Sequence, residues 1–245
     1  MGVNAILFDF GHTLMDFGRT EDALKGAYSV IREKLVHWVE DHSPPEVDEL
    51  VERVAAEIDR MVEHSYAQQA VEELDIFELF SHAFSGMGYE LPQELLREVI
   101  EIDHEALRQT VRIDPETIAT LELLRERGLK IGLVSNVVQL PELLHRDLAE
   151  FGIAERVDAV ALSSEVGIRK PRPQIFEYAL EKLDTKPVDA VFVGDRLVDD
   201  IAGAHALGMK AILTHQYRQE QPDDDIVPDA TVRTVTEVPD LIASW

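Results

Sequence analysis

The clearest pattern in the chain is a series of short apolar segments that each end at a polar residue. Three runs of β-favouring residues, which begin near positions 5, 130 and 190, stop abruptly at side chains that can act in chemistry. Continuous apolar runs of this length are typical of strands covered on both faces, and therefore of a parallel sheet between helices. In such sheets, ligands bind beyond the carboxyl ends of the strands. The residues expected to meet in one crevice are Asp9, Ser135, Asn136 and Asp195.

The rest of the chain divides into two patterns. From about residue 19 to residue 108, apolar residues recur with helical spacing and predict four amphipathic helices with acidic outer faces. From Asp114 onward, helices and strands alternate, and the polar stretch 216–229 is expected to be a solvated loop. We predict strands at 130–134, 157–162, 190–194, 210–214 and 230–232, and helices at 115–127, 141–150, 173–184, 199–207 and 238–243.

This order of elements predicts an α/β fold class, with a parallel sheet flanked by helices and an inserted all-helical domain. We assign residues 1–17 and 110–245 to the core and residues 18–109 to the insert. Both connections to the insert leave the sheet at its carboxyl edge, so the insert is expected to cover the crevice as a lid. The alternative is a helical domain that does not contact the crevice.

Composition narrows the possible functions. The 245 residues include no cysteine, which excludes disulfides, thiolate metal sites and cysteine nucleophiles. The net charge of -25 argues against nucleic acid as a partner, and an anionic substrate must be attracted locally by a metal ion or a few cations. Such acidity fits a halophilic source or an ordinary acidic protein. Because we find neither a leader nor a membrane-spanning run, we expect a cytoplasmic protein that does not bind membranes. The sequence does not predict the oligomeric state.

Carboxylates at two strand ends predict a metal site. Asp9 follows the first strand, and Asp195 follows Gly194 and precedes Asp199 and Asp200. Three carboxylates within six positions would repel one another without a cation. Asp9 facing Asp195 across neighbouring strands would form a hard-oxygen site suited to Mg²⁺. At least one of Asp199 and Asp200 is alternatively the cap of the helix that begins there.

Two further islands supply polar and cationic groups. Ser135 and Asn136 offer a hydroxyl and an amide that suit phosphate or carboxylate oxygens, although such a pair is also common in turns. Lys170 precedes Pro171, and Pro173 begins the next predicted helix. The prolines would hold the lysine near the crevice, where it could offset the charge of a nucleophile and a substrate.

Taken together and in this order, these islands resemble the haloacid dehalogenase (HAD) superfamily of hydrolases, subfamily I with a helical C1 cap. The first motif of that family corresponds to Asp9-Phe10-Gly11-His12-Thr13, and its second to Ser135. Its third corresponds to Lys170-Pro171, and its fourth to Gly194-Asp195 with Asp199-Asp200. The resemblance covers essentially the whole chain. It implies a Rossmann-like core with a helical cap.

The resemblance also implies a mechanism. Phosphatases of this family use the first aspartate, here Asp9, as a nucleophile that forms an aspartyl-phosphate. We expect a small anionic substrate, most simply a phosphate ester, and Mg²⁺ as the cofactor. The implied metal ligands are Asp9, the carbonyl of Gly11, Asp195 and Asp200, and the implied phosphate-binding residues are Ser135, Asn136, Lys170, Thr13 and His12.

One position departs from the family pattern. Most family phosphatases carry a second aspartate where this chain has Gly11, and that residue protonates the leaving oxygen and then activates water. Such general acid–base help contributes roughly 10²–10⁴-fold. A histidine could replace it, or the reaction could need no acid, as in 2-haloacid dehalogenases and phosphonatases, or the protein could be a weak hydrolase or a binding protein. The histidines considered are His12, His37, His42 and His64, and the lysines considered for a phosphonatase are Lys25 and Lys34.

The predicted cap does not identify the substrate. Three of its arginines could reach an anionic substrate, but arginines on acidic helices usually form surface ion pairs that contribute about 0–1 kcal/mol. The arginines are Arg19, Arg32 and Arg108.

The fourth motif keeps the metal-binding form of the phosphatases, which weakens the dehalogenase alternative.

Overall fold

The central feature of the computed structural model, which describes residues 2–38 and 43–245, is a parallel sheet. In this part of the chain, six strands lie in the order β3-β2-β1-β4-β5-β6, and each is parallel to its neighbours. The predicted α/β class is confirmed, with the strand expected at 157–162 beginning two residues later. The strands are β1 (Ala5–Phe8), β2 (Lys130–Ser135), β3 (Ala159–Leu162), β4 (Ala190–Gly194), β5 (Lys210–Thr214) and β6 (Ala230–Val232).

Helices cover both faces of this sheet. Successive side chains of a strand point to opposite faces, so Ile6 and Phe8 pack into one hydrophobic cluster while Ala5 and Leu7 pack into another. The first cluster includes α6 (Pro115–Glu126), α7 (Pro141–Glu150) and α11 (Val238–Ile242), and the second includes α9 (Pro173–Lys182) and α10 (Gly203–Ala206). Burial on both faces explains the continuous apolar runs in the sequence.

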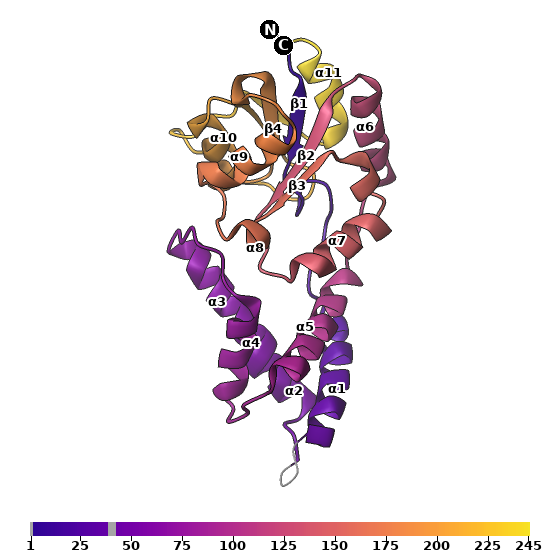
Figure 1. Ribbon diagram of the computed structural model, residues 1–245, viewed down its shortest axis with the longest axis vertical. Helices are drawn as coiled ribbons and strands as arrows, with labels where there is room; N and C mark the ends of the chain where they lie inside the picture. Colours follow the sequence, from indigo (N-terminus) through magenta and orange to yellow (C-terminus); the bar gives the residue numbers. More distant parts are fainter. Residues whose placement is uncertain (1, 39–42) are drawn as a thin grey trace.

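A separate hydrophobic cluster joins the helices of residues 21–108. In Figure 1 these helices lie at the end of the molecule away from both chain termini. The helix expected around residues 47–62 extends to Ala67 and contains a π-helical segment, Val51–Ala55. The elements are α1 (Glu21–Trp38), α2 (Val47–Leu50), α3 (Ala56–Ala67), α4 (Ile76–Ser85) and α5 (Gln93–Arg108). No helix within residues 2–38 and 43–245 combines the length and the apolar character needed to cross a bilayer.

Strand register determines where the polar side chains lie. Phe8 of β1 is paired with Leu133 of β2 and with Val193 of β4. The residues that follow these three positions therefore emerge at the same edge of the sheet. A short helix that the sequence did not predict, α8 (Ser163–Val166), follows β3 at this edge.

Candidate active site

Three carboxylates converge at the carboxyl edge of the sheet. The backbone N–H of Asp9 donates to the carbonyl of Val193 (2.9 Å), which extends the β1–β4 pairing one residue beyond the strand. Asp9, Asp195 and Asp200 are at most 7% exposed. Each offers a carboxylate oxygen, and the three oxygens lie within 4.8 Å of one another. The structure thus brings together the acidic residues that the sequence placed at two separate strand ends.

Gly194 allows this close approach. A Cβ atom at this position would collide with the Asp200 side chain. One oxygen of Asp200 accepts the backbone N–H of Arg196 (2.9 Å), so this aspartate also satisfies the start of the π-helical segment Leu197–Ala202. In the Gly-Asp pair, the glycine is therefore needed for space and the aspartate for its carboxylate.

Lys170 lies between two of the carboxylates. Its Nζ donates to Oδ1 of Asp9 (2.6 Å) and to Oδ1 of Asp200 (2.7 Å), and the residue is only 3% exposed. The side chain of Asn136 accepts the backbone N–H of Lys170 (2.7 Å) and donates to its carbonyl (3.1 Å). Asn136 was expected to contact phosphate, and in this structure its amide holds the backbone that carries the lysine.

Asp195 has two partners that orient it. Thr13 Oγ1 donates to its Oδ1 (3.3 Å), and Arg218 Nη1 donates to its Oδ2 (2.8 Å). Thr13 is fully buried and does not line the cavity of about 270 Å³ that lies beside this cluster. Arg218 belongs to the stretch 216–229, which was expected to be a solvated loop, and Glu220 of the same stretch accepts the N–H of Leu197 (2.7 Å). That expectation was wrong for these two side chains, which fold back onto the site.

The carboxylates face a cavity of about 270 Å³. It contains most of the predicted site residues and several that sequence reasoning missed, of which Tyr66 alone comes from helices α1–α5 among the described residues. The lining residues are Asp9, Gly11, His12, Phe17, Tyr66, Ser135, Asn136, Lys170, Asp195, Arg196, Asp199, Asp200 and Arg218.

Burial and mutual repulsion disfavour the charged carboxylates. Burial raises the pKa of Asp9 to about 6, with a further contribution from the charge of Asp195 and an opposing one from Lys170. The pKa values of Asp195 and Asp200 are also raised, chiefly by burial. Burial disfavours the Lys170 ammonium, but the charges of Asp200 and Asp9 outweigh it and raise the pKa of that lysine. A cluster of carboxylate oxygens that is not neutralised by neighbouring cationic side chains fits a small divalent cation such as Mg²⁺.

Gly11 leaves a space that Phe17 fills. A Cβ atom on Gly11 would lie 2.9 Å from Cε1 of Phe17, closer than such atoms normally approach. The ring of His12 stacks on Phe17 with a centroid distance of 4.5 Å, and its Nδ1 lies 3.4 Å from Oδ1 of Asp16. His12 lines the cavity, and burial followed by the charge of Arg218 lowers its pKa. His12 therefore borders the site one residue after the position that, by the family resemblance, carries a second carboxylate in most phosphatases.

The other candidate side chains lie elsewhere. Among the described residues, none of the remaining histidines, lysines and arginines considered above lines the 270 Å³ cavity, and His42 lies outside the described part of the chain. The two lysines form exposed ion pairs, Arg32 pairs with Glu46, Arg108 pairs with carboxylates of α5 and α7, and Arg19 pairs with the buried Asp103. The residues concerned are His37, His64, Lys25, Lys34, Arg19, Arg32 and Arg108.

The parallel α/β fold with a buried carboxylate–lysine cluster at the carboxyl edge of the sheet fits a hydrolase of the α/β class. A family model described as haloacid dehalogenase-like hydrolase matches residues 3–208, so the chain belongs to this family of hydrolases.

Relatives of the chain carry out more than one reaction. A glyceraldehyde 3-phosphate phosphatase from Methanopyrus kandleri is 28% identical over 98% of this chain and 97% of its own length. The crystal structure of a HAD phosphatase from Thermococcus onnurineus has a TM-score of 0.63 and 27% identity, with 98% of each chain covered. That of a 2-haloacid dehalogenase from Pseudomonas syringae has a TM-score of 0.73 and 27% identity, with 99% of each chain covered. Both reaction types therefore occur among proteins that are similar over their full length.

Proposed function

We propose that the protein is a Mg²⁺-dependent phosphatase that acts on a small phosphorylated metabolite through an aspartyl-phosphate at Asp9. The observation that carries this proposal is the cluster of Asp9, Asp195 and Asp200 around Lys170. Among the described lining residues, four carboxylates face three permanently positive side chains. A bound divalent cation would make this cavity net positive, so that it could receive a phosphate dianion despite the acidic chain.

The ion would be held by Asp9, Asp195, Asp200 and the carbonyl of Gly11, and it would neutralise phosphoryl charge and orient the group for attack. Lys170 donates to Oδ1 of Asp9, and of the two Asp9 oxygens one would hold the ion while the other would attack phosphorus in line. The bond from this oxygen to phosphorus forms as the bond to the leaving oxygen breaks. Water then hydrolyses the acyl phosphate and regenerates the Asp9 carboxylate. The hydroxyl of Ser135, which lines the cavity, would donate to a phosphoryl oxygen.

The absence of a carboxylate at Gly11 would affect the leaving group. The departing oxygen must take its proton from water or from the substrate itself, since glycine offers no acid. We therefore expect faster turnover of esters whose leaving oxygen is already weakly basic, such as aryl phosphates. The phosphatase names of the full-length relatives support a phosphate ester as the substrate.

The second candidate function is 2-haloacid dehalogenation, which the similarity to the Pseudomonas syringae enzyme and the glycine at position 11 favour. A halide leaving group needs no proton. Against it stands the acidic cluster, because Asp195 and Asp200 place negative charge beside a nucleophile that would attack a carboxylate-bearing substrate.

The deciding experiment is turnover of p-nitrophenyl phosphate with Mg²⁺ or with EDTA. We expect activity with Mg²⁺ only, and a loss of about 10⁴-fold in Asp9→Asn, because the nucleophile is removed. The matched control is Asp184→Asn, which removes an exposed carboxylate far from the cavity and should leave the rate unchanged. Chloride release from 2-chloropropionate in EDTA would establish the dehalogenase instead. Neither activity in a folded protein would indicate a binding role.

We also propose that residues 18–109 form a cap that opens and closes over this site. The segment 65–73 contacts the residues just before Lys170: the N–H of Arg169 donates to the carbonyl of Val71 (2.7 Å), and the N–H of Glu73 donates to the carbonyl of Gly167 (3.1 Å). Arg169 is 1% exposed, and its guanidinium lies 4.6 Å from the ring of Tyr66. Opening would break these contacts and expose the cavity.

A disulfide would test this cap. Glu72 and Ile168 are partners in an antiparallel bridge, and the two flanking hydrogen bonds make them a non-hydrogen-bonded pair. Cα atoms of such pairs are about 4.5 Å apart, which permits a disulfide. Because the chain has no cysteine, Glu72→Cys/Ile168→Cys would form one defined crosslink. We expect oxidation to suppress turnover and reduction to restore it, and each single cysteine variant is the control. Equal rates in both states would contradict a cap that must open.

A further inference from the structure

A second, smaller cavity lies beside the catalytic one. Its volume is about 80 Å³, and it shares Gly11, Phe17, Ser135 and Asn136 with the 270 Å³ cavity. Much of its remaining wall is apolar and comes from the loop after β1, from α5 and the turn after it, from the loop after β2 and from α7 with the residue that ends it. These apolar residues are Phe10, Met15, Leu107, Val111, Val137, Leu144 and Phe151.

Besides Arg108, whose buried Nε lacks a well-aligned hydrogen bond but lies 3.2 Å from Oδ1 of Asp147, two polar side chains of this wall each have a buried atom without a partner. Nε2 of His104 is bonded to Oδ2 of Asp147 (2.7 Å), whereas its Nδ1 is buried and has no hydrogen-bond partner within the described residues. Oε1 of Gln139 is likewise buried and unpaired in that part of the chain. The two residues are 2% and 6% exposed. Unpaired buried polar atoms are unfavourable, so these two atoms indicate a missing hydrogen-bond partner.

The cavity favours an uncharged group over an anion. Its one arginine, Arg108, already contacts three carboxylates, those of Glu105, Asp147 and Glu150. An additional anion would therefore meet more negative than positive charge. A hydroxyl group, in contrast, could donate its proton to the free Oε1 of Gln139 or to Nδ1 of His104, whose Nε2–H donates to Asp147.

We propose that this cavity binds the carbon part of the substrate, a chain of three or four non-hydrogen atoms that ends in an uncharged hydroxyl group. This inference rests on the proposed phosphatase function. The phosphoryl group would lie beside Asp9 and Ser135, and the leaving group would extend past Ser135 and Asn136, which line both cavities. An apolar cavity of about 150 Å³ holds benzene, so about 80 Å³ suits roughly half that number of atoms.

A series of alkylphosphonates tests the size of the cavity. These compounds cannot be hydrolysed at the carbon–phosphorus bond by the proposed chemistry, and their inhibition constants against p-nitrophenyl phosphate can be measured with Mg²⁺ present. We expect the constant to fall about fourfold per methylene from methyl- to propylphosphonate, the equivalent of about 0.8 kcal/mol for each buried group. It should rise again for hexylphosphonate. A flat series, or a constant that keeps falling to hexyl, would overturn the proposal.

Two variants test the residues. Val111→Phe should fill the cavity and weaken propylphosphonate at least tenfold while changing methylphosphonate little, and Val188→Phe, at a position 69% exposed, is the matched control. In the wild type, 3-hydroxypropylphosphonate should bind more tightly than propylphosphonate, and Gln139→Leu should remove this preference even if Val111→Phe does not fold. A preference that persists in Gln139→Leu would contradict the assigned contact.

The same series separates this inference from the proposed function. If p-nitrophenyl phosphate is not hydrolysed, the phosphatase proposal fails, but calorimetric titration with the phosphonates still measures binding. Chain-length dependence without turnover would support the cavity as a binding site. Turnover without chain-length dependence would overturn the cavity and leave the phosphatase proposal intact.

Discussion

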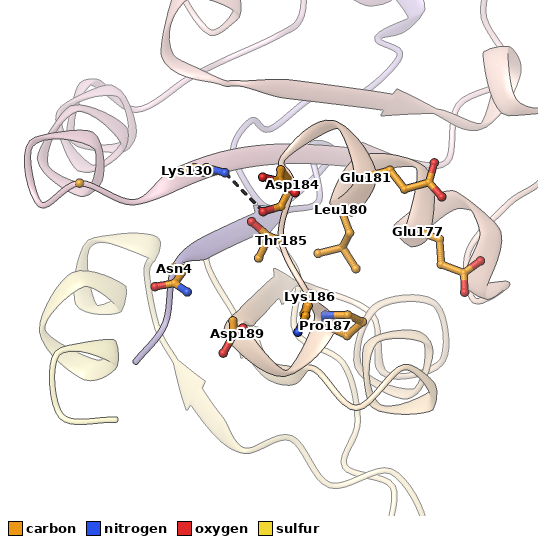
Figure 2. Close-up of a pocket in the computed structure, with 11 residues that line it drawn as sticks. Asn4, Lys130, Glu177, Leu180, Glu181, Asp184, Thr185, Lys186, Pro187 and Asp189 are labelled. Atoms are coloured by element: carbon orange, nitrogen blue, oxygen red, sulfur yellow. Dashed lines mark hydrogen bonds between the residues drawn. The ribbon is translucent and has the colours of Figure 1, made fainter. Parts of the chain in front are cut away.

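The two edges of the sheet carry similar residue types in very different environments. At the carboxyl edge, the charged groups of Asp9, Asp200 and Lys170 are almost fully buried around a cavity of about 270 Å³. At the amino edge, where Asn4 precedes β1 and Lys130 begins β2, the hollow is larger, about 850 Å³. Figure 2 shows this second hollow, with carboxylates spread along its border rather than gathered at one point.

This difference shows that the volume of a hollow does not by itself identify the functional site. Glu177, Glu181 and Asp184 at the amino edge are exposed, and water and salt screen charges there. Lys130 donates to a backbone carbonyl, that of Leu183, and so serves the fold. At the carboxyl edge, burial raises the pKa of Asp9, and the fold places three carboxylates close together, a condition typical of functional sites.

The largest effect on this comparison should come from removing a predicted metal ligand. Asp195→Asn or Asp200→Asn should lower Mg²⁺ affinity and turnover by more than about 10²-fold, because each replaces one of the three carboxylates that would hold the ion by a neutral amide. The measurements are calorimetric titration with MgCl₂ and p-nitrophenyl phosphate hydrolysis.

Asp189→Asn at the amino edge is the matched control, since it removes one carboxylate from the other hollow. It should change neither quantity. Equal losses at the two edges would mean that overall charge, and not the buried cluster, attracts the ion.

Much of this carboxyl edge could be predicted from the sequence, because the position of a residue directly after a predicted strand shows at which edge of a parallel sheet it lies. Asp9 and Asp195 directly follow apolar runs, and parallel strands end at a common edge. The local pattern did not distinguish Asp199 from Asp200, and only the family resemblance implied Asp200. In the structure, the π-helical segment that begins at Leu197 turns Asp200 fully inward and leaves Asp199 partly exposed.

Residues that reach the site by tertiary contact gave no local signal. Arg218 lies in a polar stretch with proline and several aspartates, which resembles any solvated loop, and only the fold shows that it bonds Asp195. Tyr66 lies at the end of a helix whose apolar stripe predicts packing. Phe17 could be recognised only once its ring was found beside the Cα of Gly11.

A smaller effect should follow from restoring the second carboxylate. Gly11→Asp alone should give little gain, because its Cβ would meet the Phe17 ring. Gly11→Asp/Phe17→Ala has the required space, and we expect kcat for an alkyl phosphate to rise by up to about 10²-fold, with a weaker gain for p-nitrophenyl phosphate.

Steady-state kinetics on both substrates checks this expectation. Gly18→Asp, at a position with open space around it, is the control for the added charge. A gain in that control, or none in the double variant, would show that the missing acid does not limit the rate.

The smallest effect concerns the stability of the metal-free protein. A pKa of about 6 for Asp9, against an ordinary value of 3.8, means that the folded state binds this proton more tightly than the unfolded state. The unfolding free energy therefore falls as pH rises from about 4 to about 6, by up to about 3 kcal/mol from this group.

Asp9→Asn cannot ionise, so in EDTA it should match the wild type near pH 4 and be more stable above pH 6. Urea unfolding of both proteins, with Asp184→Asn as the control, measures the difference. Saturating Mg²⁺ should reverse it, because the ion stabilises the protein that retains the carboxylate. If the difference in unfolding free energy between the two proteins does not change with pH, the charged form of Asp9 is not destabilised by its burial. The carboxyl edge would then not differ from the amino edge in this respect.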